Sequence, residues 1–231
     1  MRRTVVSVLS VLTLSGALGA AAAQETVNEP SSGVPFPLRL VAPSGGEQIL
    51  MGTGLRTKTF LKVKVYAFGL YVDSAAGQAA MATFAGKDQK TLEKDDAFYG
   101  ALLKMSFPMT LRLVMTRDVG GDDMAEAFDG ALRPRVQQAA AEMSMPGGEA
   151  ALDTFRGYFS VEEMTKESEL LFSCTNGTLA SSVKGEARAP IQSPALCWAL
   201  FDVYLGQKPI SGDGKKKVIA NFPALIAAGG M

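Results

Sequence analysis

The alternation of apolar and polar positions is most regular at residues 60–72, which read FLKVKVYAFGLYV. Residues of one parity are apolar throughout, whereas those of the other parity are charged early in the run and aromatic or aliphatic late. Because successive side chains of a strand point to opposite faces, the pattern predicts a strand with one core face and a second face that is half covered. The expected core face consists of Leu61, Val63, Val65, Ala67, Gly69 and Tyr71.

Tyr66 and Arg56 are the polar side chains that this pattern singles out. Tyr66 lies where the half-covered face changes from charged to apolar, and Arg56 precedes the run on the same side of the pattern. A sheet face of this kind predicts a cleft at the boundary between its covered and open parts. The plainer interpretation is a surface arginine and an interfacial tyrosine, and periodicity alone slightly favours that interpretation.

The stretch GTGLR at 52–56 contains two glycines directly before Arg56. A strand follows these glycines rather than a helix, and no Gly-Lys-Ser/Thr is present, so a phosphate-binding loop is not indicated. A turn or bulge in which glycine lets two backbones approach closely explains the stretch better.

Turn-forming residues separate several further elements. One hairpin is predicted at 37–54 around Pro43–Gly46, and another at 168–187 around Asn176–Gly177, a pair that favours a two-residue hairpin loop. A further strand is expected at 109–119. Grouped strands and clustered helices predict an α+β fold, with an antiparallel sheet covered on one face by helices. The expected helices are two within 77–105 broken at Gly86, one capped by Asp122 and kinked or ended by Pro134, one at 148–159, one capped by Ser193 and ended by Gly206, and a last one at 212–230.

The first 23 residues have the pattern of an export signal. Two arginines precede an apolar stretch, and three alanines form an A-x-A cleavage pattern before Gln24. This arrangement is typical of a secretory signal peptide at 1–23 and predicts a periplasmic or secreted protein; an N-terminal helix of the fold is the alternative. Residues 24–35 are polar and rich in Pro, Gly and Ser, so they predict a flexible linker before a folded domain at 36–231.

Charge and composition exclude several classes of function. The chain has 23 Lys and Arg against 23 Asp and Glu, and 21 against 23 without residues 1–23, which hold two arginines and no acidic residue. Without a basic excess, a nucleic-acid partner is not expected. The chain has no histidine, which excludes Ser-His-Asp and Cys-His catalysis and His-ligated zinc. We therefore expect no cofactor and no metal, and no second apolar run is long enough to predict a membrane span.

The two cysteines, Cys174 and Cys197, allow two interpretations. Export to an oxidising compartment would permit a disulfide between them. Each lies within an apolar stretch, however, which favours two small buried hydrophobic residues.

Five segments, taken in order and spacing, resemble the chalcone isomerase superfamily. The resemblance covers roughly residues 36–228 and implies an open-faced β-sandwich, in which a large antiparallel sheet is covered by a layer of helices. This fold agrees with the α+β class inferred from the pattern of elements. The segments are GTGLR, KVYAFGLYVD, LRLVMTRDVGGDDMAEAFDGALRPR, NGTLASSVKGEARAPIQSPALCWALFDVYLG and GDGKKKVIANFPALI.

The superfamily contains both enzymes and binding proteins. Its plant enzymes close a chalcone to a chiral flavanone by intramolecular Michael addition, and its non-catalytic members bind fatty acids in a related cleft. Arg56 matches the arginine that is central in the enzymes. Three further polar positions of the enzymes, a threonine, a tyrosine and an asparagine, fall on Tyr66, Met124 and Ala131. The resemblance thus implies loss of the tyrosine–asparagine pair and an Arg–Tyr pair similar to the one that holds the carboxylate in the fatty-acid-binding branch.

These observations predict an exported, non-catalytic protein that binds a fatty acid or similar lipophilic carboxylate. A guanidinium can hold a carboxylate in a bidentate fork, so Arg56 is the predicted anchor and Tyr66 its partner. Phe68, Met124 and Ala131 are the predicted lining of the cleft. One alternative is an intramolecular lyase acting on a chalcone-like enone, with Arg56 stabilising an anionic oxygen. A second alternative is a structural or interaction protein of the envelope with an empty cleft.

Overall fold

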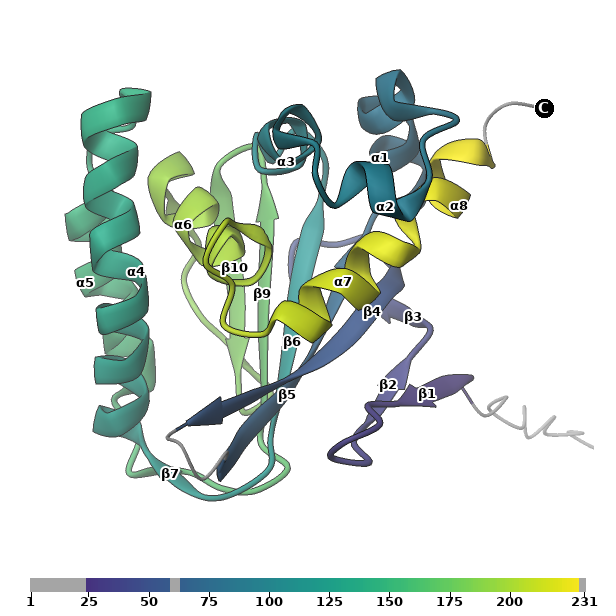
Figure 1. Cartoon of the computed structure of the whole chain (residues 1–231). Helices are drawn as coiled ribbons and strands as arrows, with labels where there is room; N and C mark the ends of the chain where they lie inside the picture. The colour runs from purple at the N-terminus through teal and green to yellow at the C-terminus, as the bar shows by residue number, and fades with distance from the viewer. Residues whose placement is uncertain (1–23, 59–62, 229–231) are drawn as a thin grey trace, which may run out of the picture.

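An eight-stranded sheet, antiparallel at every pairing, forms one layer of the molecule (Figure 1). The computed structural model describes residues 24–58 and 63–228, so the predicted signal peptide lies outside the described residues. The strand order is β11-β10-β9-β6-β5-β4-β3, with β12 paired to β10. The strands are β3 (Arg39–Val41), β4 (Glu47–Lys58), β5 (Val63–Val72), β6 (Met109–Met115), β9 (Glu169–Thr175), β10 (Thr178–Val183), β11 (Glu186–Ala187) and β12 (Ile191–Gln192).

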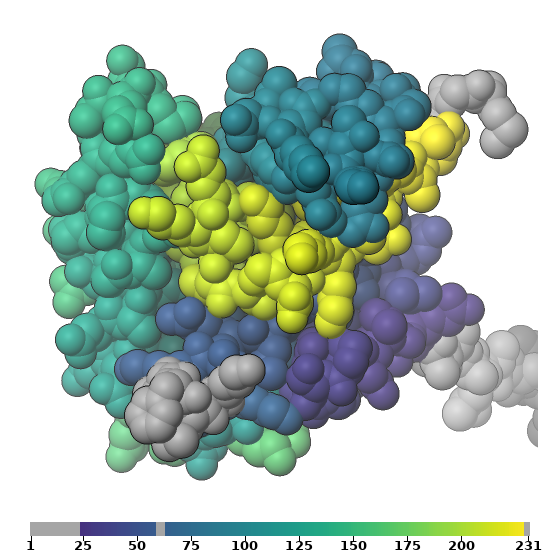
Figure 2. Space-filling model, viewed as in Figure 1, coloured from purple at the N-terminus to yellow at the C-terminus, as the bar shows by residue number. Residues whose placement is uncertain are grey.

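Helices cover one face of this sheet, as the pattern of elements predicts (Figure 1). Figure 2 shows the C-terminal helices in yellow over the middle of the helical face, with blue atoms of β4 and β5 emerging beside them. The helices are α1 (Ser74–Met81), η1 (Ala82–Phe84), α2 (Gln89–Leu92), α3 (Asp96–Leu102), α4 (Gly121–Met143), α5 (Gly148–Arg156), η2 (Gly157–Phe159), α6 (Pro194–Leu205), α7 (Gly212–Ala220) and α8 (Phe222–Ala227). Two short strands pair with each other apart from the large sheet: β7 (Val119–Gly120) lies directly before α4, and β8 (Glu163–Met164) follows η2.

Both predicted hairpins are confirmed. β3 pairs with β4, and β9 pairs with β10 through Asn176 and Gly177. The two turn residues have φ angles of 50° and 74°, the left-handed conformation that a type I′ hairpin loop requires. Helix α6 also follows its prediction, because the Ser193 hydroxyl accepts a hydrogen bond from the Leu196 amide at the helix start.

Three details of the predicted helices are wrong. Pro134 neither ends nor divides α4, which continues to Met143; its ring is exposed, while the opposite side of the helix packs on α5 and α6. Asp122 does not cap α4 either, since the cap position is Gly120 and Asp122 lies in the first turn, where a carboxylate favours the helix dipole. The predicted C-terminal helix is two helices, α7 and α8, which meet at Asn221.

The main core lies between the helices and the sheet, on the face of β5 formed by Tyr66, Phe68, Leu70 and Val72. The sequence predicts the opposite parity as the core face, and this is wrong. Of that set, Ala67 and Tyr71 belong to a second, smaller cluster on the outer face, together with Phe36 and Val114. Leu61 of the predicted set lies outside the described residues. The periodicity misleads here because both faces of the strand are apolar in its second half.

Residues 24–35, predicted as a flexible linker, take part in a β-hairpin instead. Strand β1 (Thr26–Asn28) pairs with β2 (Pro35–Pro37). The turn between them is organised by Glu29, which is 1% exposed and whose carboxylate accepts hydrogen bonds from the amides of Ser31 and Ser32. This polar segment is therefore structured, because the Glu29 carboxylate accepts hydrogen bonds from the backbone amides of the turn.

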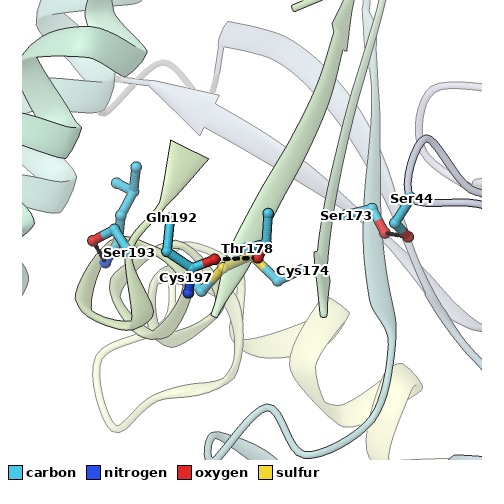
Figure 3. Close-up of a disulfide and its surroundings, with 8 residues drawn as sticks. Ser44, Ser173, Cys174, Thr178, Gln192, Ser193 and Cys197 are labelled. Carbon is cyan, nitrogen blue, oxygen red and sulfur yellow. Dashed lines mark hydrogen bonds between the residues drawn. A yellow bond between two sulfur atoms is a disulfide. The ribbon is translucent and has the colours of Figure 1, made fainter. Parts of the chain in front are cut away.

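Cys174 of β9 and Cys197 of α6 form a disulfide, shown in Figure 3. Their Cα atoms are 5.9 Å apart, and both residues are fully buried. The favoured interpretation of two separate buried thiols is therefore wrong, although the expected burial is correct. The bond fastens α6 to the middle of the sheet. Next to it, the Thr178 hydroxyl donates to the Gln192 side chain.

Candidate functional site

Helix α7 lies directly on β4 beside Arg56, because β4 has glycines at the positions of contact. Gly52, Gly54 and Arg56 alternate along β4 and face the helical layer. A Cβ on Gly52 would lie 2.7 Å from the backbone nitrogen of Val218, and one on Gly54 would lie 2.8 Å from the Cα of Gly214. The close backbone approach predicted for 52–56 is confirmed, although the stretch lies within a strand and not in a turn. Arg56 follows these two glycines on the same face of β4, and unlike them it carries a side chain.

Arg56 and Tyr66 are directly opposite each other on neighbouring strands, so their side chains share one face of the sheet. The register between β4 and β5 shifts immediately after this pair, where Val65 is the extra residue of a bulge. Bulges of this kind redirect side chains and are common next to functional sites. Tyr66 is 7% exposed and Lys64 is exposed, so the predicted change from solvent to apolar surroundings falls between them.

Tyr204 is a third polar residue at this place, contributed by α6. Its hydroxyl lies 3.0 Å from the hydroxyl of Tyr66. Its ring packs edge-on against Phe68, with centroids 4.9 Å apart, and the residue is 1% exposed. The sequence pattern assigns Tyr204 only to the apolar side of the helix at 193–206. The available indication was that a buried tyrosine needs a hydrogen-bond partner for its hydroxyl.

Burial raises the pKa of Tyr66, and the hydrogen bond with Tyr204 and the positive charge of Arg56 partly offset this effect. Burial also holds the pKa of Tyr204 well above its ordinary value, and the neighbouring Tyr66 raises it further, whereas Arg56 lowers it. Both phenols are therefore neutral at physiological pH. The guanidinium of Arg56 acts electrostatically on both hydroxyls, which places the three polar groups in one local environment.

Arg56 differs from most arginines of the described residues in that no carboxylate contacts it. Six of the eight described arginines contact a carboxylate. Arg117 is exposed and donates to the carbonyl of Asp118. Arg56 alone combines partial burial with no carboxylate partner among residues 24–58 and 63–228. A partly desolvated guanidinium of this kind is suited to bind an external anion.

The remaining predicted residues lie in or against the main core. Phe68 is buried on the same strand face as Tyr66. Met124 is buried and Ala131 is half-buried; both are on α4, two helical turns apart, and both pack against the main core cluster. The structure thus brings Arg56, Tyr66 and Phe68 together on the sheet, and places Met124 and Ala131 on one side of the helix that flanks it.

Two surface hollows in the described part of the chain lie elsewhere. One, of about 640 Å³, lies around Lys90 and Asp95 of the α2–α3 region, and the other, of about 440 Å³, lies between β4, α1 and α8 near Leu50 and Asn221. None of the five predicted site residues lines either hollow. Neither hollow is therefore the predicted binding cleft, which stays a prediction, and Tyr66, Phe68 and Tyr204 near Arg56 are buried.

Two further findings apply to the described residues. No helix among them combines the length and the apolar character needed to cross a bilayer. Within the same ranges, no three His, Cys, Asp or Glu side chains are grouped as metal ligands.

The fold and the Arg56 site can now be compared with known proteins. The family described as "Chalcone isomerase like" matches residues 46–219, and the chain belongs to this family. Fatty-acid-binding protein 2 of Arabidopsis thaliana is 28% identical over 199 residues, which cover 82% of this chain and 49% of that protein, so the chain spans about half of this relative's length. The chalcone–flavanone isomerase of Oryza sativa subsp. japonica is 25% identical over 209 residues, covering 85% of this chain and 89% of that enzyme.

A solved structure confirms the predicted fold. The crystal structure of a fatty-acid-binding protein of Arabidopsis thaliana matches with a TM-score of 0.75 at 23% identity, covering 88% of this chain and 100% of that one. At this identity the likeness establishes the fold alone. The large antiparallel sheet with its layer of helices is the chalcone isomerase type of fold that the sequence resemblance implies.

Proposed function

We propose that this protein binds a fatty acid or a similar lipophilic carboxylate, without catalysis, with Arg56 as the anchor of the carboxylate. The observation that supports this most is a partly buried guanidinium that has no carboxylate partner among the described residues and lies opposite the buried Tyr66. The guanidinium offers two parallel N–H donors to a carboxylate, and the phenol of Tyr66 adds a third donor.

The relatives support a lipophilic ligand. Fatty-acid-binding proteins are among the proteins to which this chain is similar in sequence and in fold. Met124 and Ala131, at the positions where the resemblance places a tyrosine and an asparagine in the enzymes, carry no hydrogen-bonding side chain. They cannot orient a water molecule or a chalcone hydroxyl, but they suit contact with an alkyl chain.

Head group and tail contribute differently to the expected affinity. Each buried methylene supplies about 0.8 kcal/mol, so each carbon added to the chain should lower the dissociation constant about fourfold until the tail outgrows the site. Loss of the charge-assisted bonds to Arg56 costs about 1.5–3 kcal/mol, which corresponds to an affinity about 10- to 150-fold weaker. The tail therefore determines how steeply affinity rises with chain length. Arg56 contributes a constant amount of binding free energy at every chain length.

Isothermal titration with saturated fatty acids of increasing length tests this proposal. Arg56→Ala should weaken binding of every member of the series by a similar factor and leave the slope unchanged. Arg117→Ala is the matched control, because it removes the same charge from an exposed arginine that has no carboxylate partner among the described residues. Equal affinities of the Arg56→Ala and Arg117→Ala variants would contradict the proposal.

The second candidate function is an intramolecular lyase reaction on a chalcone-like enone. Its support is the similarity to the chalcone–flavanone isomerase of rice over 85% of this chain and 89% of that enzyme. Turnover of naringenin chalcone above the spontaneous rate, lost in Arg56→Ala and kept in Arg117→Ala, would favour the enzyme over the binding protein.

We also propose that the protein is exported. The signal-peptide pattern at 1–23 motivates this proposal, and the disulfide between Cys174 and Cys197 supports it, because such bonds persist in oxidising compartments. Fractionation of the producing cells, followed by mass spectrometry of the intact protein, should find it in the exported fraction and beginning at Gln24. Recovery of the full-length chain in the cytosol would contradict export.

A further inference from the structure

The hydrogen bond between Tyr66 and Tyr204 joins residues from β5 and α6 that are 138 positions apart in the chain. Both residues are more than nine-tenths buried. Neither hydroxyl has a second protein partner among the described residues. The two phenols therefore form a closed pair in the interior, next to the guanidinium of Arg56.

The donors and acceptors of this pair do not balance. Each phenol has one O–H donor, and a single bond between two phenols uses only one of the two protons. The second proton has no acceptor among the described residues, and Arg56 cannot accept it because a guanidinium is only a donor. A buried donor without an acceptor is costly, so the three side chains together favour an incoming group that accepts hydrogen bonds.

The position of Arg56 indicates which of the two protons a bound anion would use. Tyr66 lies opposite Arg56 on the sheet, whereas Tyr204 is behind it on the helix. An anion held by Arg56 would therefore meet Tyr66, and in that arrangement Tyr204 donates within the pair while Tyr66 donates to the anion.

Tyr204 is held firmly in place beside Tyr66. The disulfide of Cys197 fastens α6 to β9, and Tyr204 lies seven residues later, about two helical turns along the same side of the helix. Its ring also contacts Phe68 edge-on. Tyr204 therefore cannot turn its hydroxyl away from Tyr66 without disturbing the packing of the helix.

We propose that Tyr204 is a positioning residue that makes the site selective for an anionic head group over a neutral one. It donates to Tyr66 and thereby directs the proton of Tyr66 towards the carboxylate held by Arg56. Chains of hydrogen bonds polarise one another, so the donation also strengthens the outer bond. This inference rests on the proposed function, since it concerns the selectivity of the same carboxylate site.

The test compares laurate with 1-dodecanol, which has the same number of carbons and a neutral head, by isothermal titration. Tyr204→Phe keeps the ring against Phe68 and removes the donor. It should weaken laurate binding about three- to tenfold and leave dodecanol binding within about twofold. Tyr66→Phe should weaken laurate binding at least as much, and the double variant should be no weaker than Tyr66→Phe, because Tyr204 acts through Tyr66.

Tyr71→Phe is the matched control. It removes the hydroxyl of another buried tyrosine, one that donates to the Pro37 carbonyl on the outer face of the sheet. This variant should leave the affinities for both ligands unchanged.

Two results would overturn the inference while leaving the proposed function intact. One is unchanged laurate affinity in Tyr204→Phe in a protein whose binding depends on Arg56. The other is an equal loss for laurate and dodecanol, which would indicate only a structural role. If the wild type does not bind laurate, or binds it independently of Arg56, the proposed function and this inference fail together.

Discussion

Breaking the bond between Cys174 and Cys197 should destabilise the protein by an amount that follows from the chain length it closes. The two cysteines are separated by 23 residues in sequence. In the chain-entropy account, a crosslink over a loop of this length contributes about 3 kcal/mol, mainly by restricting the unfolded chain. For a domain of this size, a loss of about 3 kcal/mol lowers the melting temperature by about 6–12 °C.

Urea denaturation followed by circular dichroism measures this loss. The oxidised wild type is compared with the Cys174→Ala/Cys197→Ala variant and with wild type refolded under a reducing agent, which keeps both side chains. The reduced wild type isolates the crosslink, whereas the double variant also lacks two buried sulfur atoms and should be at least as unstable. Each single variant should be at least as unstable as the reduced wild type, since either change removes the bond and one buried sulfur atom.

An unfolding free energy of the reduced wild type within about 0.5 kcal/mol of the oxidised protein would refute the reasoning, because the crosslink would then contribute nothing to stability. A loss confined to the double variant would point to packing of the sulfur atoms as the source of stability.

Two further predictions concern the site and its surroundings. Gly54→Ala should lower stability and weaken fatty-acid binding, because its Cβ would lie 2.4 Å from the ring of Phe68. Gly130→Ala has open space around it on the exposed side of α4 and should raise stability by about 0.5–1 kcal/mol. Thermal melts of both variants measure these changes. Because the pKa of Tyr204 is raised in the folded protein, this residue contributes stability that is present below pH 10 and lost at higher pH. The reason is that the unfolded chain releases the Tyr204 proton at a lower pH than the folded protein. Melting temperatures of Tyr204→Phe should therefore fall less steeply at alkaline pH than those of the wild type.

Elements with local determinants could be predicted from the sequence. The hairpin at Asn176–Gly177 follows from two residues that tolerate positive φ, and α6 follows from the Ser193 cap and the Gly206 end. The resemblance also predicted Arg56 and Tyr66 as site residues; the register of β4 and β5 brings the two together, and their role stays a prediction.

Features that depend on distant contacts could not be predicted. The pairing of Cys174 with Cys197 depends on where α6 crosses β9, and an apolar context suits a free thiol and a disulfide equally well. The contact of Tyr204 with Tyr66 could not be predicted because the two residues are 138 positions apart in the chain. The hairpin at β1 and β2 was missed because composition does not show that Glu29 would satisfy its own turn.

The central claim is that Arg56 holds a lipophilic carboxylate, and mass spectrometry of the ligands that co-purify with the protein tests it most directly. Wild type, Arg56→Ala and Arg117→Ala are purified in the same way from the same expression host, and the extracted fatty acids are quantified per mole of protein. The account predicts fatty acids with the wild type and with Arg117→Ala, and their loss from Arg56→Ala. Equal retention by all three proteins would contradict it.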